Sequence, residues 1–296
     1  MSADSVTVRL MQLTDVAAVW QLTKLESWNY SMEMVRALFQ ANEDGSFVAE
    51  LENKVVGVIM GANLSETEAF GGAWIVSKEV RGKRIGTKLW EKRKEHVGDR
   101  NFGINSVASR VEPNLKLGYS VKSWKIGHIS GIIDTTSLQL SENVGFSIVP
   151  FHKESFDRLV EYDTTIHTTE RRKFLQVWLE KDLTLTLVAT KPDADDIVGY
   201  GVIQKSDEGN FLGPVYGESA DILKALLAKL INNASFGDKV DMFSPMENDI
   251  TNELLEKNKE TLKQRYASST RMYVHHDVEL PLSKVLALAT VETTLI

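Results

Sequence analysis

Residues 74–96 read WIVSKEVRGKRIGTKLWEKRKEH, and this stretch indicates how the chain is organised. The apolar run 73–76 favours a β-strand, and the helical spacing of Ile85 and Leu89 favours an amphipathic helix. A basic, glycine-containing turn at 81–86 joins the two. The first amides of a helix have no intrahelical partner, and the helix dipole adds partial positive charge there. We therefore expect this turn to bind an anion such as a phosphate group.

The charge of the turn contrasts with the charge of the whole chain. Arg81, Lys83 and Arg84 are cationic, whereas 34 basic and 41 acidic residues give the 296-residue chain a formal net charge of −7. A local cationic loop on an acidic protein favours a small anionic ligand over a nucleic acid or an anionic membrane surface. A plain strand-to-helix turn with a solvated basic face is the alternative.

Composition places the chain among ordinary globular proteins. Hydrophobic residues make up 43% and charged residues 25%, and the length allows two domains. There is no apolar run of about 18 residues, so we expect no membrane span. The N-terminal residues lack the pattern of a signal peptide. The absence of cysteine excludes disulfides and cysteine-ligated metal, and we expect a cytoplasmic protein with no metal site.

The predicted elements repeat along the chain. Each half has the order strand, two helices, three strands, helix, strand, helix, strand. The Val-Gly pairs at 56–57 and 198–199 give an offset of about 140 residues. A repeat of this length predicts two domains, at 1–136 and 144–296. Chance similarity between two α/β halves is the alternative.

The turn resembles a known family signature. Arg81-x-x-Arg84-x-Gly86 is similar to the acetyl-CoA motif Q/R-x-x-G-x-G/A of the GCN5-related N-acetyltransferases, the GNAT superfamily. Arg84 stands where the middle glycine would be. Trp28-Asn29 resembles the helix-connecting loop of a two-domain branch of that family. The resemblance implies an α/β fold of α+β type, with two tandem domains that each contain a mixed, mostly antiparallel sheet flanked by helices.

The resemblance also implies a function, the direct transfer of an acetyl group from acetyl-CoA to a primary amine. Pantetheine would pair with the main chain like an added strand, and an N–H of the same strand would stabilise the oxyanion of the tetrahedral intermediate. The implied cofactor residues are Ile75, Val76, Val80, Arg81, Gly82, Lys83, Arg84, Ile85, Gly86, Thr87 and Asn114. Asn114 could instead be a helix N-cap.

The general acid and base do not follow from the resemblance. Family members commonly carry a tyrosine shortly before an L-G-F turn, but the segment before Leu117-Gly118-Tyr119 is about one helical turn too short and has no tyrosine. Tyr119 is a substitute candidate or a core residue. Glu68 is a candidate base or a solvated hairpin residue. His167, four residues after Asp163, is a tuned acid/base group or a surface helix cap.

The acceptor side is predicted around Trp28, Asn29 and Tyr30. Trp28 offers an aromatic face to an amine, or a lid over the core. In the second half, the segment that corresponds to the turn, 216–221, places Glu218 at a helix start, where it would repel a pyrophosphate. We therefore expect one cofactor site, in the first half, with the second half covering the acceptor pocket.

The sequence leaves three hypotheses about function. The first is an acetyltransferase for a small-molecule amine rather than a histone tail, present as a monomer or homodimer. The second is an acyl-CoA-binding or regulatory protein that has lost catalysis, which the short segment before Tyr119 and the arginine at position 84 favour. The third is an interaction module with no CoA site.

Overall fold

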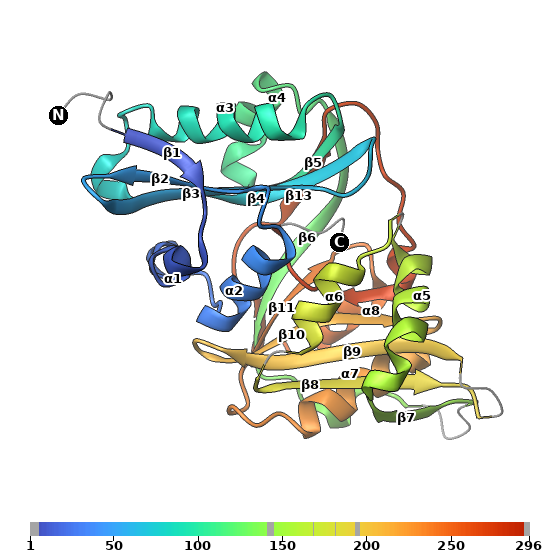
Figure 1. Cartoon of the computed structure of the whole chain (residues 1–296). Coiled ribbons are helices and arrows are strands. Elements are labelled where there is room, and N and C mark those ends of the chain that lie inside the picture. Colours follow the sequence, from blue (N-terminus) through green and yellow to red (C-terminus); the bar gives the residue numbers. More distant parts are fainter. Residues whose placement is uncertain (1–5, 141–144, 168, 181, 193–195, 293–296) are drawn as a thin grey trace.

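The computed structural model describes residues 6–140, 145–167, 169–180, 182–192 and 196–292 (Figure 1). The strands are β1 (Val6–Leu10), β2 (Ser46–Leu51), β3 (Lys54–Asn63), β4 (Glu68–Val76), β5 (Asn101–Ser106), β6 (Val121–Gly131), β7 (Ser147–Pro150), β8 (Thr184–Thr190), β9 (Ile197–Ser206), β10 (Gly209–Gly217), β11 (Val240–Pro245), β12 (Leu262–Gln264), β13 (Ser269–Tyr273) and β14 (Val285–Ala287). The helices are α1 (Val16–Leu25), α2 (Met32–Ala41), α3 (Ile85–Val97), α4 (Val111–Lys116), α5 (Phe156–Ile166), α6 (Arg172–Leu179), α7 (Ala220–Asn232) and α8 (Asp249–Lys257).

The described strands form one mixed sheet of 14 strands. Its main path runs β1-β2-β3-β4-β5-β13-β6-β11-β10-β9-β8-β7, while β12 pairs with β6 and β14 pairs with β10. Among the described pairs, only β4 with β5 and β10 with β11 are parallel. These two pairs hold the same place in the two halves, so the predicted mixed, mostly antiparallel architecture is confirmed.

The two halves exchange strands at the centre of the sheet. β13, from late in the chain, pairs with both β5 and β6, with Thr270 opposite Ser106 and Ser269 opposite Ile126. β6 in turn pairs with β11, with Val240 opposite Gly131. The predicted division between 1–136 and 144–296 therefore cuts through a continuous sheet. The division stays a prediction, and its residue 144 lies outside the described residues.

The helices build a core that the two halves share. α3 lies on one face of the first half of the sheet, and α1 and α2 lie on the other, toward the second half (Figure 1). α2 packs against α6, and one hydrophobic cluster contains Leu38 and Ile75 from the first half with Tyr200 and Leu288 from the second. The halves are thus joined by apolar packing as well as by strand pairing.

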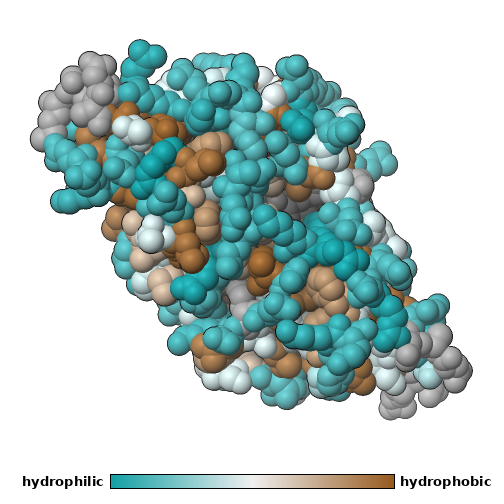
Figure 2. Space-filling model, in the orientation of Figure 1, coloured by the Kyte–Doolittle hydropathy of each residue, from teal (hydrophilic) through white to brown (hydrophobic). Residues whose placement is uncertain are grey.

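The surface is polar over most of the face in Figure 2, where the apolar residues lie in separate patches. No helix among the described ranges is long and apolar enough to cross a membrane.

Candidate acyl-transfer site

A wedge opens between β4 and β5. The two strands pair in parallel from Glu68 opposite Asn101 to Gly71 opposite Ile104. β4 then continues to Val76 without pairing to β5. The register of β4 with β3 shifts just beyond Gly72, and Ala73 there has a φ of 47°. A bulge of this kind bends a strand and ends its pairing, which leaves the edge of β4 open toward β5.

The basic turn follows β4 after a short 3-10 helix, Lys78–Val80, and leads into α3. Gly82 has a φ of 83°, and an added Cβ there would meet nothing within 4 Å. Arg84, the N-cap of α3, has φ 61° and ψ 13°, the left-handed backbone that glycine adopts most readily. The family motif has glycine at this position, so the backbone keeps the form that the motif requires. The Arg84 side chain is exposed, and among the described residues no side-chain hydrogen bond caps α3.

The cationic side chains of the turn have different roles. Arg81 donates from Nε to the carbonyl oxygen of Val76 at 2.9 Å, and its other end pairs with Glu26 at 2.5 Å. Arg81 therefore fastens the turn to β4 and to the end of α1. Within the described part of the chain, neither Lys83 nor Arg84 has an ion-pair partner, so both are available to a phosphate.

The remaining predicted cofactor residues lie along β4 and the turn. Ile75 and Ile85 are buried, whereas Val76, Val80 and Gly86 are half-buried. Thr87, in the first turn of α3, is exposed.

The last predicted cofactor residue, Asn114, lies in α4 beside the end of β5. It lies inside α4 and not at its N-cap, and its side-chain amide donates to Ser106 Oγ at 2.9 Å. The N-cap alternative is therefore wrong. Pro113 occupies the first turn of α4, where a missing N–H costs no helical hydrogen bond. Asn114 is buried and links α4 to the end of β5.

Glu292 enters the wedge from the C-terminal segment. The N–H of Ala73 donates to Glu292 Oε2 at 3.0 Å, and the Tyr30 hydroxyl donates to Oε1 at 3.2 Å. On the other side of the wedge, Asn105 Nδ2 donates to the carbonyl oxygen of Val291 at 2.9 Å. Glu292 is only 4% exposed, and burial, partly offset by these two donors, raises the pKa of its carboxyl to about 7.

Sequence reasoning missed Glu292. It lies far from the turn along the chain, so no local pattern connects the two. One signal was present: Glu292 is the only charged residue from position 285 to the C-terminus, in an otherwise apolar and Thr-containing segment. Carboxylates are rarely buried without a partner or a function.

The corresponding wedge of the second half is filled by the chain itself. β10 and β11 pair in parallel only at Asn210 and Phe211, and the register of β10 shifts between Leu212 and Val215. Beyond the shift, β14 pairs with β10, with Val215 opposite Ala287. The N–H of Leu288 then donates to the carbonyl oxygen of Phe243 in β11, 2.8 Å away. β14 therefore occupies the edge that the first half leaves open.

The predicted acceptor residues lie where the halves meet. Asn29 is buried, and its amide donates to Asp241 Oδ2 at 2.5 Å and accepts from the N–H of Glu208 at 2.7 Å. Tyr30 is buried, and its hydroxyl donates a hydrogen bond to the Glu292 carboxylate. Trp28 is half-buried and makes an edge contact with Tyr30, at 5.7 Å between ring centroids. Asn29 thus joins the halves, and Tyr30 reaches the wedge.

Trp28 lines a cleft of about 660 Å³ between the α1–α2 connection and the β9–β10 hairpin. The cleft is aromatic and charged, with Trp20, Trp28, Lys24, Asp207, Glu208 and Arg265 among its lining residues. Lys24 stacks over Trp20 at 4.3 Å and lies 3.7 Å from Asp207. The cleft can therefore hold a polar molecule, and its Trp28 contacts Tyr30, the residue whose hydroxyl reaches Glu292.

Glu68 lies outside the wedge. It is at the paired end of β4, where Oε1 contacts His276 Nε2 at 3.1 Å and Oε2 accepts from Asn101 at 3.0 Å. Five strand residues separate it from Ala73, roughly 16 Å along β4.

Tyr119 lies in the core beneath α3. It is buried, and its hydroxyl accepts a 3.3 Å hydrogen bond from Arg93 of α3. Burial raises the pKa of its hydroxyl. Its ring contacts Phe102, so the core reading of Tyr119 fits the structure better than the catalytic one.

His167 stands at the C-cap of α5, but it is buried in the second half, so the surface position of the alternative is wrong. Its Nε2 lies 3.6 Å from Asp163, too far for a hydrogen bond, and burial, reinforced by Arg171, lowers the pKa of its ring well below the ordinary value. Asp163 instead accepts from Arg171 at 2.9 and 2.6 Å and from Tyr200 at 2.6 Å. This buried cluster stabilises the second half and does not lie at the wedge.

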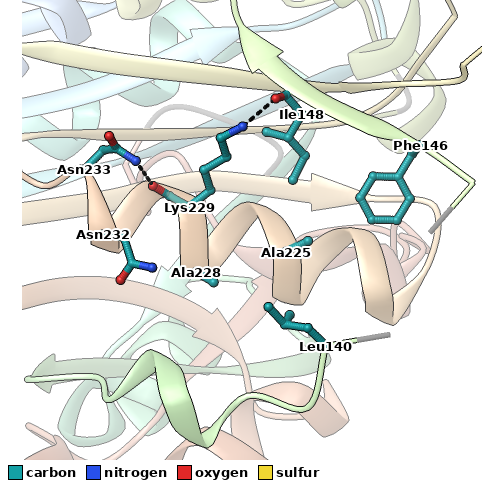
Figure 3. Close-up of a pocket in the computed structure, with 8 residues that line it drawn as sticks. All are labelled: Leu140, Phe146, Ile148, Ala225, Ala228, Lys229, Asn232 and Asn233. Atoms are coloured by element: carbon teal, nitrogen blue, oxygen red, sulfur yellow. Dashed lines mark hydrogen bonds between the residues drawn. The ribbon is translucent and has the colours of Figure 1, made fainter. Parts of the chain in front are cut away.

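A second depression, of about 420 Å³, lies over α7 in the second half (Figure 3). Its lining is mostly apolar, and the amino group of Lys229 there donates to the carbonyl oxygen of Ile148 at 2.7 Å. It offers no group for acyl transfer. Among the described residues, no cluster of three or more His, Asp or Glu side chains could hold a metal ion.

Two family models match the chain, the acetyltransferase (GNAT) family over residues 15–117 and an acetyltransferase (GNAT) domain over residues 159–285. The chain belongs to the GNAT superfamily, whose members use acyl-CoA as co-substrate. It is a two-domain member of that superfamily and an acyltransferase.

Similar proteins include the holothin acyltransferase of Pseudoalteromonas sp. (strain SANK 73390), which is 22% identical over 230 residues, 76% of each chain. An uncharacterized protein of Caenorhabditis elegans is 24% identical over 60% of this chain and 58% of its own.

Two solved structures share the fold. A putative acetyltransferase from Pyrococcus horikoshii has a TM-score of 0.75 at 15% identity, with 98% of this chain and 96% of that one covered. A tandem GNAT protein from the clavulanic acid biosynthesis pathway has a TM-score of 0.62 at 13% identity, with 90% and 98% covered.

Proposed function

We propose that this protein transfers an acetyl group from acetyl-CoA directly to a primary amine of a small metabolite. The observation that carries the proposal is the wedge at Ala73, which lies next to the uncapped start of α3. An open strand edge can pair with pantetheine, and free amides with Lys83 and Arg84 can hold a pyrophosphate.

β4 is unpaired toward β5 from Gly72 to Val76, with the N–H of Ala73 taken by Glu292, and the turn follows after the short 3-10 helix Lys78–Val80. An acyl-CoA laid along this edge has its diphosphate at the turn and its thioester near the bulge. A main-chain N–H of β4 other than that of Ala73, which already donates to Glu292, would then stabilise the oxyanion. Holding the amine against the thioester would supply much of the rate, up to about 7–11 kcal/mol in the best intramolecular cases.

The acceptor is proposed to enter from the cleft beside Trp28. Trp28 lines that cleft and would offer a cationic amine an aromatic face. Two similar proteins are named for holothin and for the clavulanic acid pathway, which favours a metabolite over a histone tail. Residues 144–296 would then cover the acceptor and residues 1–136 would bind the donor.

A release assay tests the proposal. Free CoA thiol is measured with acetyl-CoA and a panel of polyamines, amino acids, arylalkylamines and amino sugars. We expect release that depends on one class of amine, and longer acyl-CoA thioesters in the same assay would reveal the acyl preference. No release with any amine, despite saturable binding of acetyl-CoA, would exclude the proposal.

A catalytically inactive acyl-CoA-binding protein is the second candidate. It is favoured by the Glu292 carboxylate on the Ala73 N–H and by the lack of a tyrosine in α4. Both candidates require a CoA site. A ligand at 100 times its dissociation constant stabilises the native state by about 2.7 kcal/mol, so the absence of any thermal shift with millimolar acetyl-CoA would exclude both.

A further inference from the structure

We propose that the carboxylate of Glu292 is the base that removes a proton from the attacking amine. The proposal rests on the acetyl transfer proposed above and assigns one of its two proton transfers. It draws on the position of Glu292 in the wedge, on its hydrogen-bond partners and on its burial.

The position of Glu292 follows from the order of groups along β4. The turn at 81–86 and the edge at Val76 lie at one end of the open segment, and Glu292 binds the N–H of Ala73 at the other. A donor thioester that enters from the turn therefore ends beside Glu292. The main chain of Glu292 also packs against β4. A Cβ added to Gly72 would lie only 2.9 Å from the Cα of Glu292. The amine must approach the thioester carbon at this same end.

The surroundings of Glu292 suit a base. Its two hydrogen-bond donors are the Ala73 N–H from β4 and the Tyr30 hydroxyl from the α1–α2 connection. Asn105, on the β5 side, faces the adjoining carbonyl oxygen of Val291 with a neutral amide. Among the described residues no cation lies within ion-pair distance of Glu292. A pKa of about 7 lets the carboxylate take a proton near neutral pH and release it again.

Tyr30 is the positioning residue for Glu292. Its ring is buried, and it packs edge-on against Trp28 at 5.7 Å and Phe211 at 5.9 Å. These contacts fix where the hydroxyl points. Tyr30 also contacts Trp28, which lines the cleft, so it connects one wall of the cleft to the carboxylate.

Two protons leave the acceptor nitrogen during the reaction. The acceptor ammonium gives one proton to Glu292, and its nitrogen lone pair forms a C–N bond with the thioester carbonyl carbon. As the tetrahedral intermediate collapses, the C–S bond breaks and sulfur leaves with the bonding electrons. The second proton of the nitrogen passes to the thiolate. Glu292 then releases its proton to solvent, and the products are the amide and free CoA thiol.

The test compares wild type with Glu292→Gln, which keeps the size of the side chain and removes the base. We expect the rate of CoA release to fall 10²–10⁴-fold, as is usual on loss of a general base, while acetyl-CoA affinity measured by calorimetry is unchanged. The wild-type rate should rise with pH up to about 7 and then level off, and the variant should lack this inflection. Glu279→Gln, at an exposed carboxylate of the same C-terminal segment, is the matched control and should behave as wild type.

Tyr30→Phe adds a readout for the positioning role. Loss of its hydrogen bond to the carboxylate disfavours the ionised form, so the inflection should move to higher pH. An unchanged rate and pH profile in Glu292→Gln would overturn the proposal. So would a rise in its acetyl-CoA affinity and rate, which would mean that the carboxylate only blocks the wedge. If wild type itself releases no CoA with any amine, the proposed function fails and the role of Glu292 fails with it.

Discussion

The indole N–H of Trp74 donates to the carbonyl oxygen of Gly86, 3.1 Å away. This bond ties the open edge of β4 to the first turn of α3, so the two surfaces expected to hold pantetheine and pyrophosphate move together. Trp74 is 41% exposed, which is unusual for a large apolar side chain, and its bond to Gly86 explains why it stays at the surface.

Gly86→Glu should abolish acetyl-CoA binding. A Cβ at this position would lie 3.4 Å from the Trp74 indole, so the fold accepts it, but the new carboxylate would face the pyrophosphate. Calorimetry with acetyl-CoA provides the measurement. Lys94→Gln, which makes the same change in net charge at an exposed site near the other end of α3, should bind normally. Unchanged affinity in Gly86→Glu would remove the turn from the proposed site.

The filled wedge of the second half predicts one acetyl-CoA per chain. β14 pairs with β10 where pantetheine would have to pair, and Glu218 follows β10 in place of a basic turn. Calorimetric titration should therefore give a stoichiometry of one. A second binding event that survives Gly86→Glu would show that the second half also takes the donor.

Asn29→Ala should loosen the contact between the halves. The substitution removes a hydrogen bond to the buried Asp241 carboxylate and leaves the N–H of Glu208 without its acceptor. Urea unfolding should show that the free energy of unfolding falls by about 1–3 kcal/mol. Asn233→Ala changes an exposed residue beyond α7 and should lower the free energy of unfolding much less. Equal decreases in the two variants would argue against a special role for Asn29.

Asp163→Asn should destabilise the second half strongly. Burial opposes ionisation of Asp163, but Arg171 and His167 outweigh it and hold the pKa of the carboxyl below its usual value. The variant leaves the buried Arg171 without its counter-charge, which costs about 3–5 kcal/mol at neutral pH. Because the pKa is lowered, wild-type stability from this pair should fall as pH drops below about 4. Glu180→Gln breaks an exposed pair with Lys153 and should cost under about 1 kcal/mol.

The raised pKa of Glu292 predicts the opposite dependence on pH. Its protonated form is favoured in the native state, so its contribution to stability is fully present below about pH 4.5 and is lost as pH rises to about 7. The loss is at most about 3–4 kcal/mol, at about 1.4 kcal/mol per pKa unit. Urea unfolding at pH 5 and pH 8 should show this fall in wild type and not in Glu292→Gln. Equal falls in both proteins would place the effect elsewhere.

The sequence predicted the parts of the site that depend on neighbouring residues. The strand, the basic turn and the helix after it lie where expected, because hydrophobic spacing and glycine placement are local signals. Glu292 could not be found in this way, since only tertiary packing brings it to Ala73. The burial of His167 was missed for the same reason. The exchange of β13 into the first half is equally invisible to local patterns, because any strand can extend an open edge.

The position of β13 has a consequence during synthesis of the chain. When residues 1–136 have left the ribosome, β5 and β6 still lack the strand that separates them, and it arrives only with Ser269–Tyr273. Until then both strands expose unpaired edges, the kind of surface on which nascent chains associate wrongly. Contacts between such distant residues also slow folding. We therefore expect a fragment that ends at residue 136 to aggregate when expressed alone, and the nascent first half to depend on chaperones until residues 269–273 have left the ribosome.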